Sequence, residues 1–158
     1  MNDKIKKSKT VKTRKNTAKT LEIGWREWVD LPALCDRRIL AKIDTGAKTS
    51  AIHAFRIREV EIDGRPFVQF YLHPVQKKRR PEFFCTAPIH DRRLFRSSNG
   101  AEQMRIVIMA VLRLGDLERP IELSLTNRDD MEFRLLIGRD ALRKNVIIRP
   151  ARSFLLGR

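Results

Sequence analysis

Ile43-Asp44-Thr45-Gly46-Ala47 is the stretch of the sequence that decides the fold. It follows alternating apolar residues at positions 38–43, which predict a strand that ends in a tight turn. Glycine lets a second chain segment approach closely and leaves a backbone N–H free to donate to the Asp44 carboxylate. The Thr45 hydroxyl is placed to bond the backbone of a matching turn. We therefore expect a carboxylate that projects from the end of a strand into a cleft.

The Asp-Thr-Gly tripeptide supplies one carboxylate, and one carboxylate activates water poorly. Two carboxylates held about 3 Å apart share a proton, so that one acts as a base and the other as an acid. The chain carries a single such turn, so the second carboxylate would come from another copy across a two-fold axis. We expect a homodimer in which Asp44, Thr45 and Gly46 are the catalytic residues of an aspartic peptidase.

A second segment, Leu135-Leu136-Ile137-Gly138-Arg139-Asp140, predicts an apolar strand that ends in glycine and opens a short helix. The helix is expected from Arg139 to about Lys144. Taken alone, the segment is typical of an ordinary strand–turn–helix junction. Paired with the Asp-Thr-Gly turn, it predicts a neighbour of that turn, with Ala47, Gly138 and Arg139 binding the substrate.

Many short strands separated by turns indicate an all-β domain. Because the Asp44 turn and the 135–140 segment resemble the paired segments of retropepsins, the predicted fold class is a retropepsin-like acid-protease barrel, a single lobe with one short C-terminal helix. Residues 21–158 form this protease domain, and residues 1–20 form a disordered basic tail. The polar, basic segment 71–84 is the best candidate for a mobile flap, with a plain surface loop as an equal alternative.

Positive charge is spread over the whole chain of 158 residues, whose net charge is +15. Eight basic residues against Asp3 alone give the tail +7 of this total. Such a field attracts polyanions, although the tail also suits a purely solubilising role. An apolar run of the ~20 residues that cross a bilayer is absent, as is the apolar region of a secretory signal, so we expect a cytoplasmic protein without membrane contact.

The cysteines and histidines do not show the spacing of a metal site. Cys35 and Cys85 are interpreted as reduced thiols that pack as small hydrophobic side chains. The three histidines, His53, His73 and His90, form no H-E-x-x-H, so we expect no metal and no cofactor, although separated residues can still converge in space. His53 is interpreted as a core or surface histidine rather than a ligand.

The sequence resembles the family long labelled "ATP-dependent zinc protease", also described as RimK-associated, retropepsin-like (RimB-like) proteases. The resemblance covers residues 21–158 and rests on segments 24–29, 31–32, 41–51, 96–100, 123–128 and 136–142. It implies an acid-protease fold with Asp44 catalytic, and a link in some bacteria with ligases that add glutamates to a ribosomal protein. The zinc and ATP of the label find no H-E-x-x-H and no P-loop here, so we expect neither as a catalytic cofactor.

The leading functional hypothesis is an aspartic endopeptidase that acts as a homodimer on acidic, glutamate-rich polypeptide. A strongly basic protease suits such a substrate electrostatically, and the tail offers a polyanion contact. One alternative is a non-catalytic peptide-binding module of the same fold. Another is a basic ribosome- or RNA-associated protein, although RNP, KH and helix-turn-helix signatures are absent from the sequence.

Overall fold

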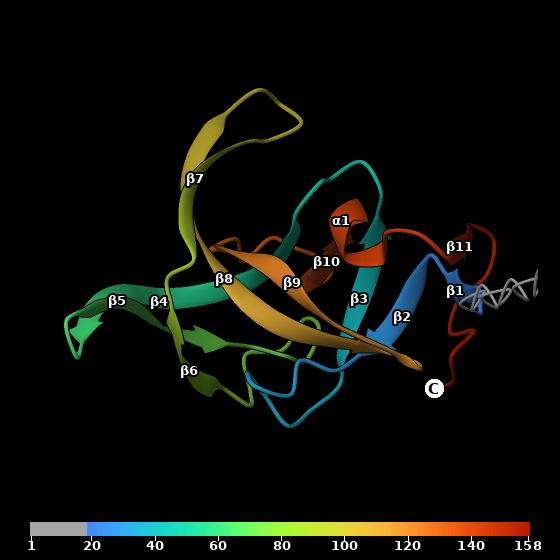
Figure 1. Cartoon of the computed structure of the whole chain (residues 1–158), viewed down its shortest axis with the longest axis horizontal. Coiled ribbons are helices and arrows are strands. Elements are labelled where there is room, and N and C mark those ends of the chain that lie inside the picture. Colours follow the sequence, from blue (N-terminus) through green and yellow to red (C-terminus); the bar gives the residue numbers. More distant parts are fainter. Residues whose placement is uncertain (1–18) are drawn as a thin grey trace, which may run out of the picture.

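The structure is a computed structural model that describes residues 19–158, so most of the predicted tail lies outside the described residues. The described chain is nearly all β (Figure 1). Its elements are β1 (Leu21–Gly24), β2 (Arg26–Val29), β3 (Ile39–Asp44), β4 (Ser50–Ile62), β5 (Arg65–Leu72), β6 (Phe83–Pro88), β7 (Asp91–Arg96), β8 (Glu102–Leu114), β9 (Leu117–Thr126), β10 (Leu135–Gly138), α1 (Arg139–Leu142) and β11 (Val146–Arg149).

The main sheet has the strand order β2-β3-β10-β4-β9-β8-β7, with β5 and β6 branching from β4. Strand β10 enters between β3 and β4, although those two strands follow each other in the sequence. It runs parallel to β3, where Gly138 pairs with Asp44, and antiparallel to β4, where Leu136 pairs with Ala51. The topology therefore brings the two segments singled out in the sequence side by side.

The barrel expected from the sequence is not closed within the described residues. The hydrogen-bonded path ends at β2 on one side and at β7 on the other. A single bridge, Asp30 with Arg113, brings the chain after β2 against β8. Pairing stops there because Pro32 follows and has no backbone N–H to donate. The retropepsin-like lobe is thus a strongly curled, open sheet.

Alternation along the strands builds the core on one side of the sheet. In β3, Ile39, Ala41 and Ile43 are buried, whereas Lys42 is exposed and Asp44 is half-buried. Strand β10 follows the same rule, with Leu135 and Ile137 fully buried. This alternation places Asp44 on the face opposite the core, where a carboxylate avoids the cost of burial.

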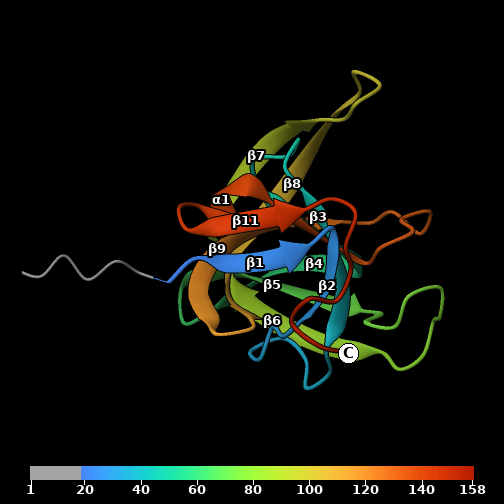
Figure 2. The ribbon, with the colours of Figure 1, turned by 90° about the vertical axis from the view of Figure 1, so that its right-hand side faces the viewer.

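Residues 21–29 form two strands, β1 and β2, with a break at Trp25. Strand β1 pairs with β11 in a separate two-stranded sheet, while β2 pairs with β3 (Figure 2). The break coincides with a tight crossing of the C-terminal segment, because a Cβ on Gly24 would lie 2.4 Å from the Arg152 carbonyl oxygen. The Trp25 N–H donates to that oxygen at 2.9 Å.

Glu27 is fully buried and fixes this crossing. One of its carboxylate oxygens accepts from the N–H of Gly24 at 2.7 Å and of Leu155 at 2.8 Å. The other accepts from the N–H of Leu156 at 3.4 Å. The buried charge is therefore matched by backbone donors, as a buried carboxylate requires.

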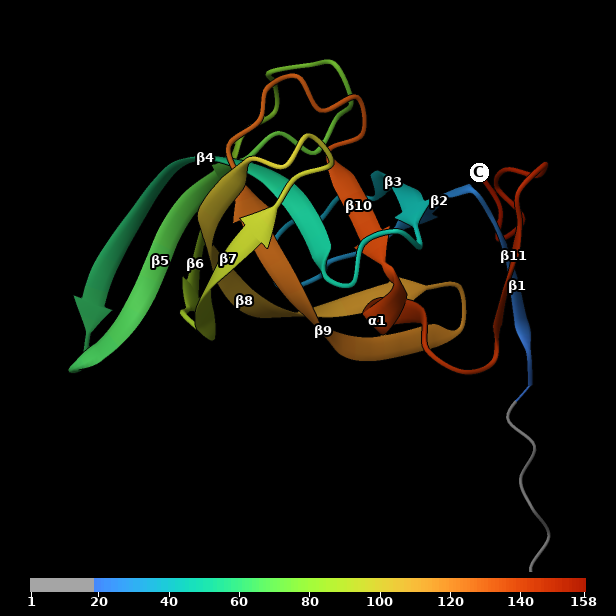
Figure 3. The ribbon, with the colours of Figure 1, turned by 90° about the horizontal axis from the view of Figure 1, so that it is seen from above.

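The β4–β5 and β7–β8 hairpins project from the body of the molecule. The β4–β5 hairpin and the parallel β1–β11 pair lie at opposite ends (Figure 3). The β7–β8 hairpin projects on the same side as the turn after β3, whereas the segment that joins β5 to β6 lies lower (Figures 1 and 2). Within the described residues, no helix is long and apolar enough to cross a membrane.

Candidate active site

The turn after β3 holds the Asp44 carboxylate by its own backbone. The Gly46 N–H donates to Asp44 Oδ1 at 3.2 Å, and the Ala47 N–H donates to the Asp44 carbonyl oxygen at 3.2 Å. A Cβ on Gly46 would lie 3.3 Å from the same carboxylate oxygen, so glycine leaves room for this short loop. Thr45 and Gly46 are exposed, and Asp44 is half-buried. The carboxylate is therefore oriented and accessible.

Strand β10 braces the turn through a contact that only glycine permits. A Cβ on Gly138 would lie 2.7 Å from the Thr49 carbonyl carbon and 2.8 Å from the Lys48 carbonyl oxygen. The backbone of Gly138 is extended, with φ −76°, so the requirement is steric rather than conformational. Its N–H donates to the Ser50 hydroxyl oxygen at 3.0 Å in a buried site.

The start of α1 is fastened to the same turn. The N–H groups of Arg139 and Asp140 donate to the carbonyl oxygens of Ala47 and Lys48, at 2.9 and 3.1 Å. Lys48 Nζ lies 2.7 Å from Asp140 Oδ2, and this hydrogen bond lowers the pKa of the Asp140 carboxyl. The Arg139 guanidinium makes longer contacts of 3.4 Å with the Thr45 and Gly46 carbonyl oxygens. The helix ends at Leu142, because Arg143 adopts a left-handed φ of 48°.

All the site residues expected from the sequence thus lie in one turn-and-helix unit. Asp44, Thr45, Gly46 and Ala47 form the turn, and Gly138 and Arg139 lie beside it. Within residues 19–158, no second acidic side chain forms a hydrogen bond or ion pair with Asp44. The unit can orient one carboxylate toward solvent, which is half of the pair that water activation requires.

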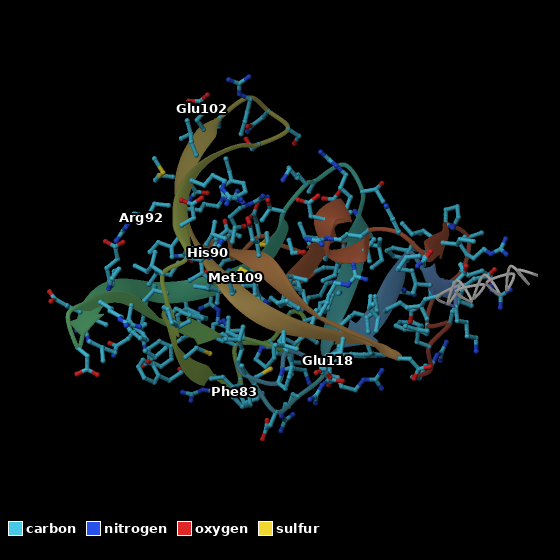
Figure 4. All side chains as sticks on the ribbon, in the orientation of Figure 1. Phe83, His90, Arg92, Glu102, Met109 and Glu118 are labelled. Carbon is cyan, nitrogen blue, oxygen red and sulfur yellow. The ribbon has the colours of Figure 1, made fainter. Side chains whose placement is uncertain are left out.

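A cavity of about 220 Å³ adjoins this unit. The turn side contributes Thr49 and Ser50, and α1 contributes Asp140 and Ala141 together with the following Arg143. The sheet side contributes His90, Met109, Pro120, Ile121 and Glu122. His90 and Met109, which both line the cavity, are labelled in Figure 4. The cavity is large enough for a side chain and combines apolar walls with charged groups at its rim.

The model of the RimB-like family, described as retropepsin-like aspartic endopeptidase RimB, matches residues 22–158. This chain belongs to that family. The match includes the Asp44 turn, the β10–α1 unit and the C-terminal segment that Glu27 fixes.

Several relatives and a solved structure are similar to this chain over most of its length. Proteins named probable alpha-L-glutamate ligase from Shewanella pealeana and Parasynechococcus marenigrum are 44% and 39% identical to this chain over 135 residues. These matches cover 85% of this chain but only 30% and 29% of those proteins, so the chain spans less than a third of their length. A Legionella pneumophila protein of unknown function has the same fold, with a TM-score of 0.69, 28% identity and coverage of 86% of this chain and 98% of that one.

One group of potential metal ligands was not predicted from the sequence. His53, His73 and Asp129 converge, and their ligand atoms lie within 4.8 Å of one another. The residues are widely separated in the chain, so their spacing gives no signal. The only sequence feature that marks the group is a histidine, His53, in a strand of buried residues. The group does not include Asp44.

Proposed function

We propose that this chain is an aspartic endopeptidase whose active site forms when two Asp44 turns meet across a two-fold axis. The observation that carries the proposal is an exposed turn that orients the Asp44 carboxylate, to which no second acidic side chain is bonded within the described residues. A partner turn supplies the missing carboxylate by symmetry. The family assignment supports the peptidase class.

The two carboxylates hold one proton between them, because like charges about 3 Å apart resist joint ionisation. The ionised carboxylate accepts a proton from a water molecule as that water attacks the peptide carbonyl carbon. The protonated carboxyl of the second Asp44 donates to the carbonyl oxygen, which gives a gem-diol. The carboxyl formed on the first Asp44 then protonates the amide nitrogen as the C–N bond breaks, while the second Asp44 takes back a proton from a diol hydroxyl. The products are a carboxylic acid and an amine, and the pair returns to its starting protonation.

The remaining site residues have supporting roles in this proposal. The Gly46 N–H keeps the carboxylate coplanar with its turn, and the Thr45 hydroxyl bonds the partner's backbone to lock the two turns together. Ala47 and Arg139 line the edge of the cleft where the substrate backbone lies, and the buried Gly138, expected from the sequence to bind substrate, supports the turn from behind. The cavity beside α1 accepts a substrate side chain.

An acidic polypeptide is the substrate class that charge favours. The net charge of +15 attracts negatively charged chains and raises their local concentration. The relatives named probable alpha-L-glutamate ligase carry a region similar to this chain within a longer protein. A peptidase joined to a ligase of glutamate is well placed to act on the glutamate-rich product. The proposed location is the cytoplasm.

Asp44→Asn tests the chemistry, with Asp116→Asn as the matched control, since Asp116 is an exposed aspartate in the β8–β9 turn. Both variants and the wild type are assayed on a glutamate-rich peptide and on the same peptide with glutamine in place of glutamate. We expect cleavage of the acidic peptide by the wild type and by Asp116→Asn only. Cleavage by Asp44→Asn at the wild-type rate would refute the mechanism, and peptide binding without cleavage by the wild type would indicate a binding module instead.

Mixing experiments test the shared site. Wild-type chains are incubated with Asp44→Asn chains until subunits have exchanged. If mixed dimers are inactive, activity per wild-type chain falls to about a half at equal amounts and about a quarter with a threefold excess of variant. Sedimentation should give a mass near twice 18.5 kDa. Activity that is unchanged by the excess, from a particle of monomer mass, would contradict the dimeric site.

A further inference from the structure

A buried polar group lies away from the Asp44 turn, beside the start of β10, whereas Gly138 next to Asp44 is the last residue of that strand. His53 on β4 is 1% exposed, and His73, which follows β5, is 6% exposed. Asp129, in the segment before β10, presents its carboxylate to them. The backbone N–H of His53 donates to the backbone carbonyl oxygen of Arg134, which lies four residues before Gly138. At ~3.3 Å per residue, this contact lies ~13 Å along β10 from the level of Asp44.

Three of the four imidazole nitrogens of this group lack hydrogen-bond partners. His53 Nε2 and both His73 nitrogens are buried without a hydrogen bond in the described structure. Buried polar atoms are almost always paired, so several orphans in one place indicate a missing ligand. The nearest charged atoms are Asp129 Oδ1, 3.3 Å from His53 Nε2, and Glu82 Oε1, 3.5 Å from His73 Nε2.

We propose that His53, His73 and Asp129 bind a divalent transition-metal ion, with Glu82 as a fourth ligand, and that Zn²⁺ fits this set best. Two imidazoles with one or two carboxylates suit zinc, whereas calcium and magnesium prefer oxygen ligands throughout. The ligands come from β4, from the segment that joins β5 to β6, and from the segment before β10. The ion would therefore attach two long connections, the one between β5 and β6 and the one between β9 and β10, to strand β4.

Two features of the surroundings oppose binding of the ion: a hydrogen bond to His53 and the buried charge of Arg134. His53 Nδ1 accepts from the Arg128 N–H at 3.1 Å, which places the ring proton on Nε2. Binding through Nε2 moves that proton to Nδ1, so the Arg128 N–H must turn away and the segment that carries Asp129 must adjust. Arg134 is also buried, with unpaired Nε and Nη1 atoms, and its charge opposes a cation. The carboxylates of Asp129 and Glu82 offset that charge.

The ion is expected to act on the fold and not on peptide hydrolysis, since its ligands do not include Asp44. The 71–84 segment, interpreted from the sequence as either a mobile flap or a plain surface loop, would be fixed near its start through His73. Trp25 offers a built-in reporter, because its ring packs edge-on against Phe133 at 5.8 Å between centroids, within the segment that must adjust.

The test is a zinc titration of the full-length, chelator-treated chain by calorimetry, with Trp fluorescence and thermal unfolding as further readouts. We expect one Zn²⁺ per chain, a change in fluorescence, and a higher unfolding temperature. His73→Gln and Asp129→Asn should weaken binding at least tenfold, while His90→Gln, a histidine outside the group, should bind as the wild type does. Asp129 is exposed, so its variant keeps the test valid if His73→Gln misfolds.

Three outcomes would overturn the proposal. These are no binding at micromolar zinc, binding that survives both ligand substitutions, or binding that His90→Gln alone removes. None of the readouts uses peptidase activity, so failure here leaves the proposed function untouched, and failure of that function leaves the metal site untouched.

Discussion

Gly138→Ala is the perturbation that most directly tests the brace behind the catalytic turn. The added Cβ would lie 2.7 Å from the Thr49 carbonyl carbon, 2.8 Å from the Lys48 carbonyl oxygen and 2.9 Å from the Ser50 nitrogen. All three atoms belong to the backbone, so no rotamer change relieves the contact. Because ordinary carbon contacts begin at about 3.5 Å, the two segments must separate by about 0.8 Å.

Overpacking of this kind costs about 1–3 kcal/mol of the free energy of unfolding. For a domain of this size, that corresponds to a fall in the unfolding temperature of about 2–12 °C. The displacement falls on residues 48–50, directly after the turn that carries Asp44. A misplacement near 1 Å at a catalytic group costs about 10²-fold in rate. We therefore expect Gly138→Ala to lose peptidase activity well beyond its loss of stability.

Gly115→Ala is the matched control, because it should destabilise the fold without moving the turn. Gly115 lies in the β8–β9 turn with φ 57°, and a left-handed alanine costs about 1–2 kcal/mol. Both variants are compared by chemical unfolding and by kcat/KM at a temperature where each is folded. Wild-type stability of Gly138→Ala would refute the steric reasoning. Loss of activity in both variants alike would refute the link between this brace and the site.

Three further substitutions or reactions probe other parts of the fold. Glu27 is fully buried and its carboxylate accepts from three N–H groups, and Glu27→Gln replaces one of the two acceptor oxygens by an NH₂ group. It should therefore lower the free energy of unfolding by about 1–3 kcal/mol, as measured by chemical unfolding. An unchanged free energy of unfolding would show that these donors do not need the second oxygen or its charge. Burial raises the pKa of Cys85 to about 12 and also raises that of Cys35, so neither thiol should react with a disulfide reagent at pH 8 until the chain unfolds. Lys48→Met should raise the pKa of the Asp140 carboxyl toward its ordinary value in an NMR titration, since the Lys48 hydrogen bond lowers it. The stability that this pair adds is present above the ordinary Asp pKa and is lost as the pH falls through the lowered one, but both side chains are exposed, so the effect should stay below about 1 kcal/mol.

The geometry of the Asp44 turn could be predicted from the sequence because its contacts are local. Asp44, Thr45 and Gly46 are adjacent, and the hydrogen bond from Gly46 to the carboxylate spans two residues. The neighbouring position of Gly138 could be inferred from a glycine between an apolar strand and a helix. The cause of that glycine could not, because its steric conflict is with residues 48–50, which only the insertion of β10 between β3 and β4 brings near.

The features that sequence patterns did not predict depend on contacts between residues far apart in the chain. Glu27 is an acidic residue between two tryptophans, and its burial depends on N–H groups from Leu155 and Leu156 at the far end of the chain. The open sheet likewise depends on where β2 stops against β8, which no strand pattern specifies. Cys35 and Cys85 are free and buried, as the sequence indicated, since burial of a small apolar side chain needs no particular partner.

Strand β10 links the two sites proposed for this chain, and its geometry decides how far they should influence each other. Its last residue, Gly138, pairs with Asp44, while Arg134, just before its start, receives the hydrogen bond from His53. The strand is four residues long and held between β3 and β4, so a change at its start reaches its end only as a shift of the whole strand. Interiors packed in this way resist such shifts. Removal of zinc should therefore lower the temperature at which activity is lost while leaving kcat of the folded enzyme unchanged, and a fall in kcat far below the unfolding temperature would show that the two ends are coupled.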